Sequence, residues 1–307
     1  MLVLHPLSET TRQRLIAGGV DPDAVAAVAR MALREDLAGG TDVTSAATVP
    51  AEQRSEATFG ARGSGTLAGL SVAAAVVETL CGAEATELEQ LAADGDRVQA
   101  GTEVARVVAP TRLLLTAERS SLNLLCHLSG IATLTRRWVD AIEGTGAVVR
   151  DTRKTTPGLR FLEKYAVRCG GGANHRLALS DAALVKDNHV LAAGGVAAAF
   201  AAVRSLAATI PVEIEVDTLA GLDEAMDAGA DLVLLDNFSV EQMRAGVQAR
   251  NDYAAASGRR VLLEASGGLT LEVARSVAST GVDYIAVGAL THSAPVLDLG
   301  LDLRAVS

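Results

Sequence analysis

Six short apolar runs recur along the chain from residue 147 onward, and they constrain its fold more than any other feature. They are AVVRD (147–151), AALVKD (182–187), VEIEVD (212–217), LVLLD (232–236), VLLEAS (261–266) and YIAVG (284–288). Alanine-rich segments with helical spacing separate them. Strands that alternate with helices form a parallel sheet with right-handed crossovers, and its buried strands are mostly apolar. This half of the chain is therefore α/β, either a barrel or an open doubly wound sheet.

The ends of the runs distinguish between these two architectures. Each run finishes in polar residues or glycine: Asp151 with Arg153 and Lys154, Lys186 to Asn188, Glu213 to Asp217, Asp236 with Asn237, Glu264 to Gly268, and Gly288. In α/β barrels the active site forms at the carboxyl ends of several strands, whereas an open sheet uses mainly its switch point. Functional groups at all six ends favour a barrel.

Residues 1–128 mix helical and strand patterns and predict a separate domain. Helical spacing marks 21–36 and 116–144, while 56–70 has the pattern of strand, turn and strand. The segment GDRVQAG (95–101) resembles the hairpin turn of biotinyl and lipoyl carrier domains, but those need a modifiable lysine and this half has none. We therefore expect a similar sandwich or hammerhead topology without a carrier function.

The composition excludes several classes of function. The formal net charge is -10 and aromatic residues make up 3%, whereas nucleic-acid binders carry basic surfaces and aromatic stacking residues. The most apolar stretch, 67–83, is interrupted by Ser71 and Glu78, which predicts a buried or amphipathic helix and no membrane span. The N-terminus lacks the pattern of a signal peptide. Three cysteines without a CxxC pair argue against zinc and disulfides, so we expect a cytoplasmic protein with reduced thiols.

Cationic side chains gather between residues 151 and 186 although the chain is acidic. The candidate ligands for an anion are Arg153, Lys154, His175, Arg176 and Lys186. Arginine offers a planar fork that fits carboxylate and phosphate, and lysine a compact charge, so the set suits a multiply anionic substrate. Arg160, Lys164 and Arg168 have helical spacing and are expected to be exposed charges. A Schiff-base aldolase that uses Lys186 is an alternative, but so many cations suit polyanion binding at least as well.

Glu215 and Asp236 end neighbouring strands beside the predicted anion site. Two acids that face a polyanion need a cation between them, and Mg²⁺ with phosphate oxygens is the usual solution. The alternatives are a helix N-cap for Asp236 and solvent exposure for Glu215. The pair therefore predicts a magnesium site.

Three glycine segments complete the predicted site. Residues 265–270 and 286–293 each place glycine after a strand, where backbone N–H groups can bind phosphate, as the last loops of many α/β barrels do. GGGANHR (170–176) lacks dinucleotide-binding and Walker spacing. We interpret it as a loop that brings His175 and Arg176 to the ligand.

These motifs together resemble the quinolinate phosphoribosyltransferases, also called nicotinate-nucleotide pyrophosphorylases (carboxylating). The similarity covers nearly the whole chain. It includes REDLAGGTDVTS (34–45), ERSSLNLLCHLSGIAT (118–133), DTRKTTPGLRFLEKYAVRCGGGANHR (151–176), LVKDNH (184–189), EIEVD (213–217), LLDN (234–237), EASGG (264–268) and GALTHSAPVLDLGLD (288–302). The DTRKT, GGGxNHR and KDNH elements are specific in combination.

The resemblance implies a two-domain subunit. Residues 1–128, joined by the C-terminal tail 296–307, would form an N-terminal α/β sandwich (hammerhead-like) domain, and 129–295 an open, incomplete TIM-like α/β barrel. It also implies a homodimer in which Arg119 completes the active site of the partner subunit. On chemistry alone, Arg119 is an exposed helix charge beside Glu118.

The implied reaction joins quinolinate to phosphoribosyl pyrophosphate with Mg²⁺ and yields nicotinate mononucleotide, pyrophosphate and CO₂, a step of de novo NAD synthesis. The resemblance assigns catalysis to Lys154, Lys186, Glu215 and Asp236, of which Glu215 and Asp236 bind the metal. It assigns substrate binding to Arg119, Arg153, His175, Arg176, Lys186, Ser266, Gly267 and Gly288. Two alternatives stay open: a paralogous phosphoribosyltransferase for nicotinate or another small acid, and a non-catalytic protein that binds these ligands.

Overall fold

The computed structural model describes residues 3–304, which divide into two compact units. The first unit takes in the described residues up to Leu134, Phe161–Gly171 and the residues from Ser293 onward. The second contains Thr135–Arg160 and Gly172–His292. The units divide after Leu134 and before Ser293, whereas the sequence predicted boundaries at residues 128 and 295. The short segment Phe161–Gly171 also lies with the first unit.

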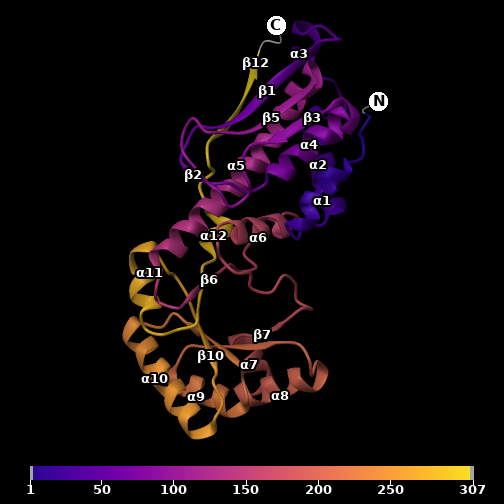
Figure 1. Cartoon of the computed structure of the whole chain (residues 1–307). Helices are drawn as coiled ribbons and strands as arrows, with labels where there is room; N and C mark the ends of the chain where they lie inside the picture. Colours follow the sequence, from indigo (N-terminus) through magenta and orange to yellow (C-terminus); the bar gives the residue numbers. More distant parts are fainter. Residues whose placement is uncertain (1–2, 305–307) are drawn as a thin grey trace. The chain divides into compact units, whose positions relative to one another are not determined.

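A four-stranded antiparallel sheet, of strand order β12-β1-β5-β3, forms the first unit's framework. Its strands are β1 (Arg54–Ala61), β3 (Glu87–Gln90), β5 (Glu103–Pro110) and β12 (Leu299–Arg304), while β2 (Gly65–Thr66) and β4 (Arg97–Val98) form a separate pair. The C-terminal strand β12 runs beside β1, with Gly300 opposite Gly60 (Figure 1). The tail of the chain therefore completes the first unit's sheet.

The apolar stretch of the first half forms a buried helix. The helices as far as α6 are α1 (Glu9–Ala17), α2 (Pro22–Leu37), α3 (Val43–Thr48), α4 (Leu70–Cys81), α5 (Thr111–Ala141) and α6 (Arg160–Cys169), with a 3₁₀ turn η1 (Ala83–Ala85). Every residue of α4 is buried, including Glu78, which accepts hydrogen bonds from Ser8, the N-cap of α1, and from Thr11 of α1. In residues 3–304 no single helix is long and apolar enough to cross a membrane, although the bent pair Asp187–Ala193 and Val196–Leu206 reaches that length and composition when joined.

The second unit contains a six-stranded parallel sheet of order β6-β11-β10-β9-β8-β7. Its strands are β6 (Val148–Arg150), β7 (Ala183–Val185), β8 (Val212–Val216), β9 (Leu232–Asp236), β10 (Leu262–Ser266) and β11 (Tyr284–Ala286). All six predicted strands are present. From β7 to β11, each strand pairs with the next strand along the chain, and β11 pairs with β6. Only β6 and β7, although consecutive in the chain, are not neighbours, and they form the two edges of the sheet. This is a barrel-like order left open at one seam, which confirms the expected α/β class.

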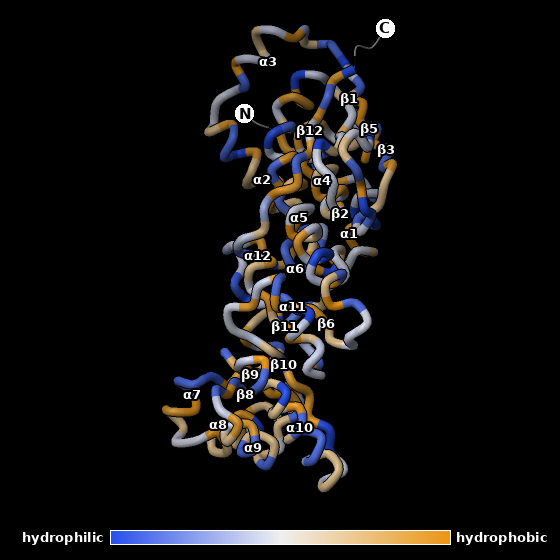
Figure 2. The backbone as a smooth tube through the Cα atoms, turned by 90° about the vertical axis from the view of Figure 1, so that its left-hand side faces the viewer, coloured by the Kyte–Doolittle hydropathy of each residue, from blue (hydrophilic) through white to orange (hydrophobic). Residues whose placement is uncertain are grey.

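Helices connect the parallel strands. They are α7 (Asp187–Ala193), α8 (Val196–Leu206), α9 (Leu219–Ala228), α10 (Val240–Ser257), α11 (Leu271–Ala278) and α12 (Ala289–His292). Figure 2 shows hydrophobic segments among α8, α9 and α10, where buried residues such as Phe200, Leu222 and Met243 contribute to the core. The register places Ser266 of β10 beside Asp236 of β9. The carboxyl ends of these strands therefore lie at one edge of the sheet, as the sequence predicted.

The charges on α6 differ from the expectation. Arg168 is exposed, but Lys164 and its neighbour Glu163 are fully buried, and Glu163 contacts the Nε2 atom of His127 at 2.9 Å. The prediction that Lys164 is an exposed charge is wrong. Helical spacing places Glu163 and Lys164 next to the apolar face of α6. Neighbouring elements cover these two side chains as well as the apolar face, so both are buried.

Candidate active site

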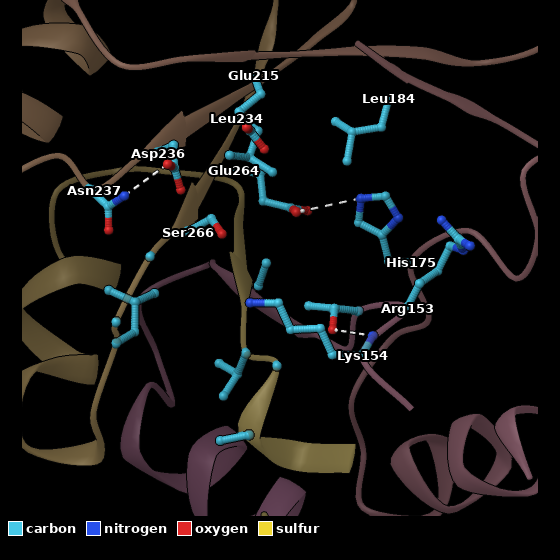
Figure 3. A pocket seen from close by; sticks show the side chains of 18 of the residues that line it. Arg153, Lys154, His175, Leu184, Glu215, Leu234, Asp236, Asn237, Glu264 and Ser266 are labelled. Atoms are coloured by element: carbon cyan, nitrogen blue, oxygen red, sulfur yellow. Dashed lines mark hydrogen bonds and ion pairs between the residues drawn. The ribbon is translucent and has the colours of Figure 1, made fainter. Parts of the chain in front are cut away.

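A cavity of about 890 Å³ lies in the second unit at the carboxyl ends of strands β7 to β11 and beside the segment that follows β6. Figure 3 shows the carboxylates of Glu215 and Asp236 on one side of it and His175 and Arg153 on the other. A concave site with a few convergent charged groups is the usual form of a small-molecule site.

The cavity brings together ten of the eleven predicted site residues. These are Arg153, Lys154, His175, Arg176, Lys186, Glu215, Asp236, Ser266, Gly267 and Gly288. The eleventh, Arg119, lies on α5 in the first unit, is exposed and does not line the cavity. The chemistry at the strand ends thus converges within one unit, and Arg119 belongs to the other unit.

Two guanidinium groups, those of Arg153 and Arg176, line the cavity. Arg176 donates from Nη1 to the carbonyl of Ala182 at 2.9 Å and is half-buried. Burial, and next the charge of Arg153, lower the pKa of Arg176. Arg153 has a buried Nε atom without a hydrogen-bond partner among the described residues. Two cations that repel each other, one with an unused donor, favour an anionic ligand.

Lys154 follows β6 and is held by its backbone. Its N–H donates to Thr152 Oγ1 at 3.0 Å, and its carbonyl accepts from Thr291 Oγ1 at 2.7 Å. A Cβ atom at Gly288 would lie 3.0 Å from the Cδ atom of Lys154, so the glycine leaves space for the lysine stem. The ammonium group of Lys154 is thereby placed across the cavity floor (Figure 3).

Lys186 and Glu215 form an ion pair, with 2.5 Å between Nζ and Oε2. The Glu215 side chain is only 13% exposed, so the alternative of a solvent-exposed Glu215 is wrong. The pairing connects a predicted substrate cation to a predicted metal ligand. Sequence alone does not reveal this contact, because the two residues end different strands.

Asp236 does not cap a helix. The N-cap of α10 is Ser239, whose hydroxyl accepts from the N–H of Gln242, so the N-cap alternative for Asp236 is wrong. Asp236 accepts instead from the side-chain amide of Asn237 at 2.8 Å. Asp236 and Glu215 offer hard oxygen atoms of the kind that Mg²⁺ prefers, so the residues present fit the metal.

A tight turn at Ser266–Gly268 forms another wall. Gly267 has φ +100°, and a Cβ atom there would lie 2.8 Å from the backbone nitrogen of Asn237 and against its side-chain amide. The N–H of Asn237 donates to the carbonyl of Ser266 at 2.9 Å. The glycine is therefore required by a close approach of two loops, and it leaves backbone groups open to the cavity.

The loop 170–176 is anchored to the end of β6. Ala173 N–H donates to the carbonyl of Val149 at 2.8 Å, and the carboxylate of Asp151 accepts from the side chain of Asn174 and the backbone N–H of His175, at 2.6 and 2.8 Å. Asp151 is fully buried. This pairing carries His175 and Arg176 to the cavity, as the interpretation of the loop predicted.

Several buried charged or polar side chains lie in the cavity wall or next to it. Glu264 is fully buried and accepts from Arg150 Nη1 at 2.6 Å, while the Arg150 guanidinium lies 4.5 Å from the ring centre of Tyr284. Burial, and next the charge of Glu213, raise the pKa of Glu264 to about 8. His175 Nε2 lies 2.7 Å from Glu213 Oε2 and 3.7 Å from Glu264 Oε1. The three side chains offer ligand atoms within 4.8 Å of one another, but the adjacent Arg150 makes a metal ion there unfavourable.

Asn237, Glu264 and His292 also line the cavity, and none of them was a predicted site residue. Asn237 directly follows β9, and Glu264 is the central residue of β10, where the usable signal was a carboxylate inside the apolar run 261–266. His292 lies on the short helix α12, and its sequence context gave no signal beyond the glycine segment that precedes it.

Comparison with known proteins identifies the family. The model of the quinolinate phosphoribosyl transferase C-terminal domain matches residues 131–302, and that of the N-terminal domain matches residues 42–129. The nicotinate-nucleotide pyrophosphorylase [carboxylating] of Mycobacterium leprae is 52% identical over 281 residues, which cover 92% of this chain and 98% of that protein. The probable enzyme of the same name from Bacillus subtilis is 40% identical and covers 88% of this chain and 90% of its own length.

Solved structures agree. NadC from Streptococcus pyogenes matches with a TM-score of 0.87 and 39% identity, over 94% of this chain and 99% of that one. The nicotinate-nucleotide pyrophosphorylase from Francisella tularensis matches with a TM-score of 0.85 and 37% identity, over 92% and 96% of the two chains. The protein belongs to the quinolinate phosphoribosyltransferase family.

Proposed function

We propose that the protein transfers the phosphoribosyl group of phosphoribosyl pyrophosphate to quinolinate and releases pyrophosphate and CO₂, forming nicotinate mononucleotide for de novo NAD synthesis. The observation that carries the proposal is one cavity whose wall combines the guanidinium groups of Arg153 and Arg176, the carboxylates of Glu215 and Asp236 and a glycine turn. Family membership supports the same reaction.

Quinolinate is a dianion and would bind at the guanidinium side. The unused Nε donor of Arg153 and the half-buried fork of Arg176 offer planar hydrogen bonds to carboxylates. Burial, and next the charge of Arg153, lower the pKa of Arg176, and a dianion between the two arginines would offset the repulsion between them. Lys186 would add a third cation once it leaves Glu215.

Phosphoribosyl pyrophosphate would bind along the glycine side. The Ser266–Gly267 turn and Gly288 would hold the 5′-phosphate through backbone N–H groups. Lys154 would offset the charge that develops on the departing pyrophosphate. Glu215 and Asp236 would hold Mg²⁺ and the ribose hydroxyls, and the metal would supply charge neutralisation for the phosphate oxygens.

The transfer requires a positively charged ribosyl centre. The bond from ribose carbon 1 to the pyrophosphate oxygen breaks, with the electron pair leaving on oxygen, and the ring nitrogen of quinolinate forms the new bond. Nearby carboxylate charge from Glu215 and Asp236 stabilises the oxocarbenium-like state, as in glycoside cleavage. The cationic ring nitrogen then accepts the electron density released when the adjacent carboxylate leaves as CO₂, and a proton replaces it.

We also propose a homodimer that shares its active sites. Arg119 is exposed on α5 of the first unit, and the family resemblance assigns it to the active site of the partner subunit. We place the enzyme in the cytoplasm, where its three free cysteines would stay reduced.

The test is to incubate the purified protein with quinolinate, phosphoribosyl pyrophosphate and Mg²⁺ and to follow nicotinate mononucleotide and CO₂ together. A parallel reaction contains nicotinate in place of quinolinate. Both products from quinolinate alone are expected. Product from nicotinate alone would favour a paralogous phosphoribosyltransferase, and binding of both ligands without turnover would favour a non-catalytic binding protein.

A further inference from the structure

A buried carboxylate, that of Asp151, fastens the loop 170–176 to the end of β6. Asp151 is fully buried. Its Oδ2 atom accepts from the side-chain amide of Asn174 at 2.6 Å, and its Oδ1 atom accepts from the backbone N–H of His175 at 2.8 Å. Both oxygens act as acceptors, which is the hydrogen-bonding pattern of an ionised carboxylate. Asp151 therefore holds two successive residues of the loop in fixed positions.

The backbone of the same loop extends the parallel sheet at its open edge. The N–H of Ala173 donates to the carbonyl of Val149 at 2.8 Å, and its carbonyl accepts from the N–H of Asp151 at 3.2 Å. This is a parallel bridge beside Arg150. β6 is an edge strand, and its other side pairs with β11. The loop therefore takes the place of a further strand at the edge where the sheet is open.

The two arginines of the cavity leave the chain on either side of this contact. Arg153 follows Asp151 by two residues. Arg176 follows Asn174 by two residues, and its Nη1 atom donates to the carbonyl of Ala182, directly before the opposite edge strand β7. Both guanidinium groups line the cavity. The contact between Asp151 and Asn174 thus fixes the span between the two chain segments that carry them.

We propose that the Asp151–Asn174 contact sets the distance between the two cavity arginines and so selects a ligand with two carboxylates over one with a single carboxylate. A dicarboxylate that meets both guanidinium forks needs their separation to be fixed, whereas a monocarboxylate meets only one of them. A misplacement of about 1 Å can cost up to about 100-fold. The proposal deepens the function proposed above and rests on it for the identity of the ligand.

The binding test compares a disrupted contact with a restored one. Asp151→Asn places two side-chain amides against each other and should weaken quinolinate binding by about 10-fold or more, while nicotinate binding changes less than about threefold. Asp151→Asn combined with Asn174→Asp exchanges donor and acceptor and keeps the total charge. The double variant should bind quinolinate within about threefold of the wild type. Titration calorimetry measures each dissociation constant.

The sign of the change separates positioning from electrostatics. Asp151→Asn removes a negative charge near two arginines, so a purely electrostatic role would strengthen the binding of a dianion. Tighter or unchanged quinolinate binding in Asp151→Asn would overturn the proposal. The same holds for a double variant that binds no better than Asp151→Asn although unfolding midpoints show that both are folded.

Asp283→Asn is the matched control. Asp283 precedes β11, at the end of the sheet opposite the cavity, and accepts from Arg250 Nη1 and from the N–H of Leu263, both at 2.9 Å. This variant should lower the unfolding midpoint and leave the quinolinate dissociation constant unchanged. A loss of quinolinate affinity equal to that of Asp151→Asn would mean that general destabilisation explains both, which would contradict a positioning role.

Amide hydrogen exchange tests the contact without any ligand. The N–H of His175 should exchange at least about 10-fold faster in Asp151→Asn than in the wild type, and the double variant should slow it again. Equal rates in Asp151→Asn and the wild type would refute the anchoring of the loop. A wild type that binds neither acid would overturn the proposed function and the selection of a dicarboxylate, whereas the exchange rates alone decide the anchoring.

Discussion

Gly267→Ala should damage the protein far more than the same change one residue later. Gly267 has φ +100°, outside the region that alanine adopts, and strain of this kind costs about 1–3 kcal/mol. The new Cβ would also lie 2.8 Å from the backbone nitrogen of Asn237, and relieving such an overlap costs about 1–3 kcal/mol more. We expect a loss of about 3 kcal/mol or more in the free energy of unfolding.

Gly268→Ala is the matched control. Its φ of +57° lies in the left-handed region, and a Cβ atom there meets nothing within 4 Å, so about 1 kcal/mol of backbone cost is expected. Urea unfolding measures both losses, and KM for phosphoribosyl pyrophosphate reports on the turn. Equal losses for the two variants would refute the argument that a close approach between loops requires Gly267.

The remaining predictions concern charge, metal and assembly. Arg176→Ala or Lys154→Ala should lower kcat/KM by about 100-fold or more while the unfolding midpoint changes little, and wild-type-like kinetics would remove either from the site. Removal of Mg²⁺ by a chelator should abolish turnover, and Glu215→Gln should raise the Mg²⁺ concentration needed for half-maximal rate. Glu264 has a pKa raised from 4.5 to about 8, so its stabilising contribution is full below pH 4.5 and is lost as the pH rises through about 8. The wild type should therefore lose stability relative to Glu264→Gln between these two pH values. Urea unfolding at several pH values measures this difference. Arg119→Ala mixed with Lys154→Ala should regain part of the activity if subunits share sites, and no recovery would count against a shared site.

The sheet and most of the cavity could be predicted because parallel strands leave a regular record in sequence. Apolar runs mark the strands, and the first polar residue after each run marks the edge where parallel strands end together. Residues as far apart as Lys154 and Ser266 are placed in one cavity by this rule alone. The rule needs no knowledge of side-chain contacts.

Pairings between side chains could not be predicted, because spacing gives the face of a residue but not its partner. Lys186 and Glu215 were assigned to different ligands, yet they contact each other at 2.5 Å. Lys164 was expected to be exposed, but helical spacing cannot show how widely neighbouring elements cover a helix. Arg119 was named only through family resemblance, since no chemical feature of its helix marks it.

A charged residue inside an apolar strand is a better indication of a positioning network than one at the strand's end. Burying a carboxylate is costly unless it is paired, so Glu213 and Glu264 persist within their strands because His175 and Arg150 contact them. The end residues, such as Glu215, lie at the cavity and can meet a ligand directly. The strands therefore carry two layers of charge. An outer layer, which includes Glu215 and Asp236, is suited to substrate and metal, and an inner layer, which includes Glu213 and Glu264, fixes the geometry of the outer one. Substitutions in the inner layer should change substrate affinity without removing any group that touches the substrate.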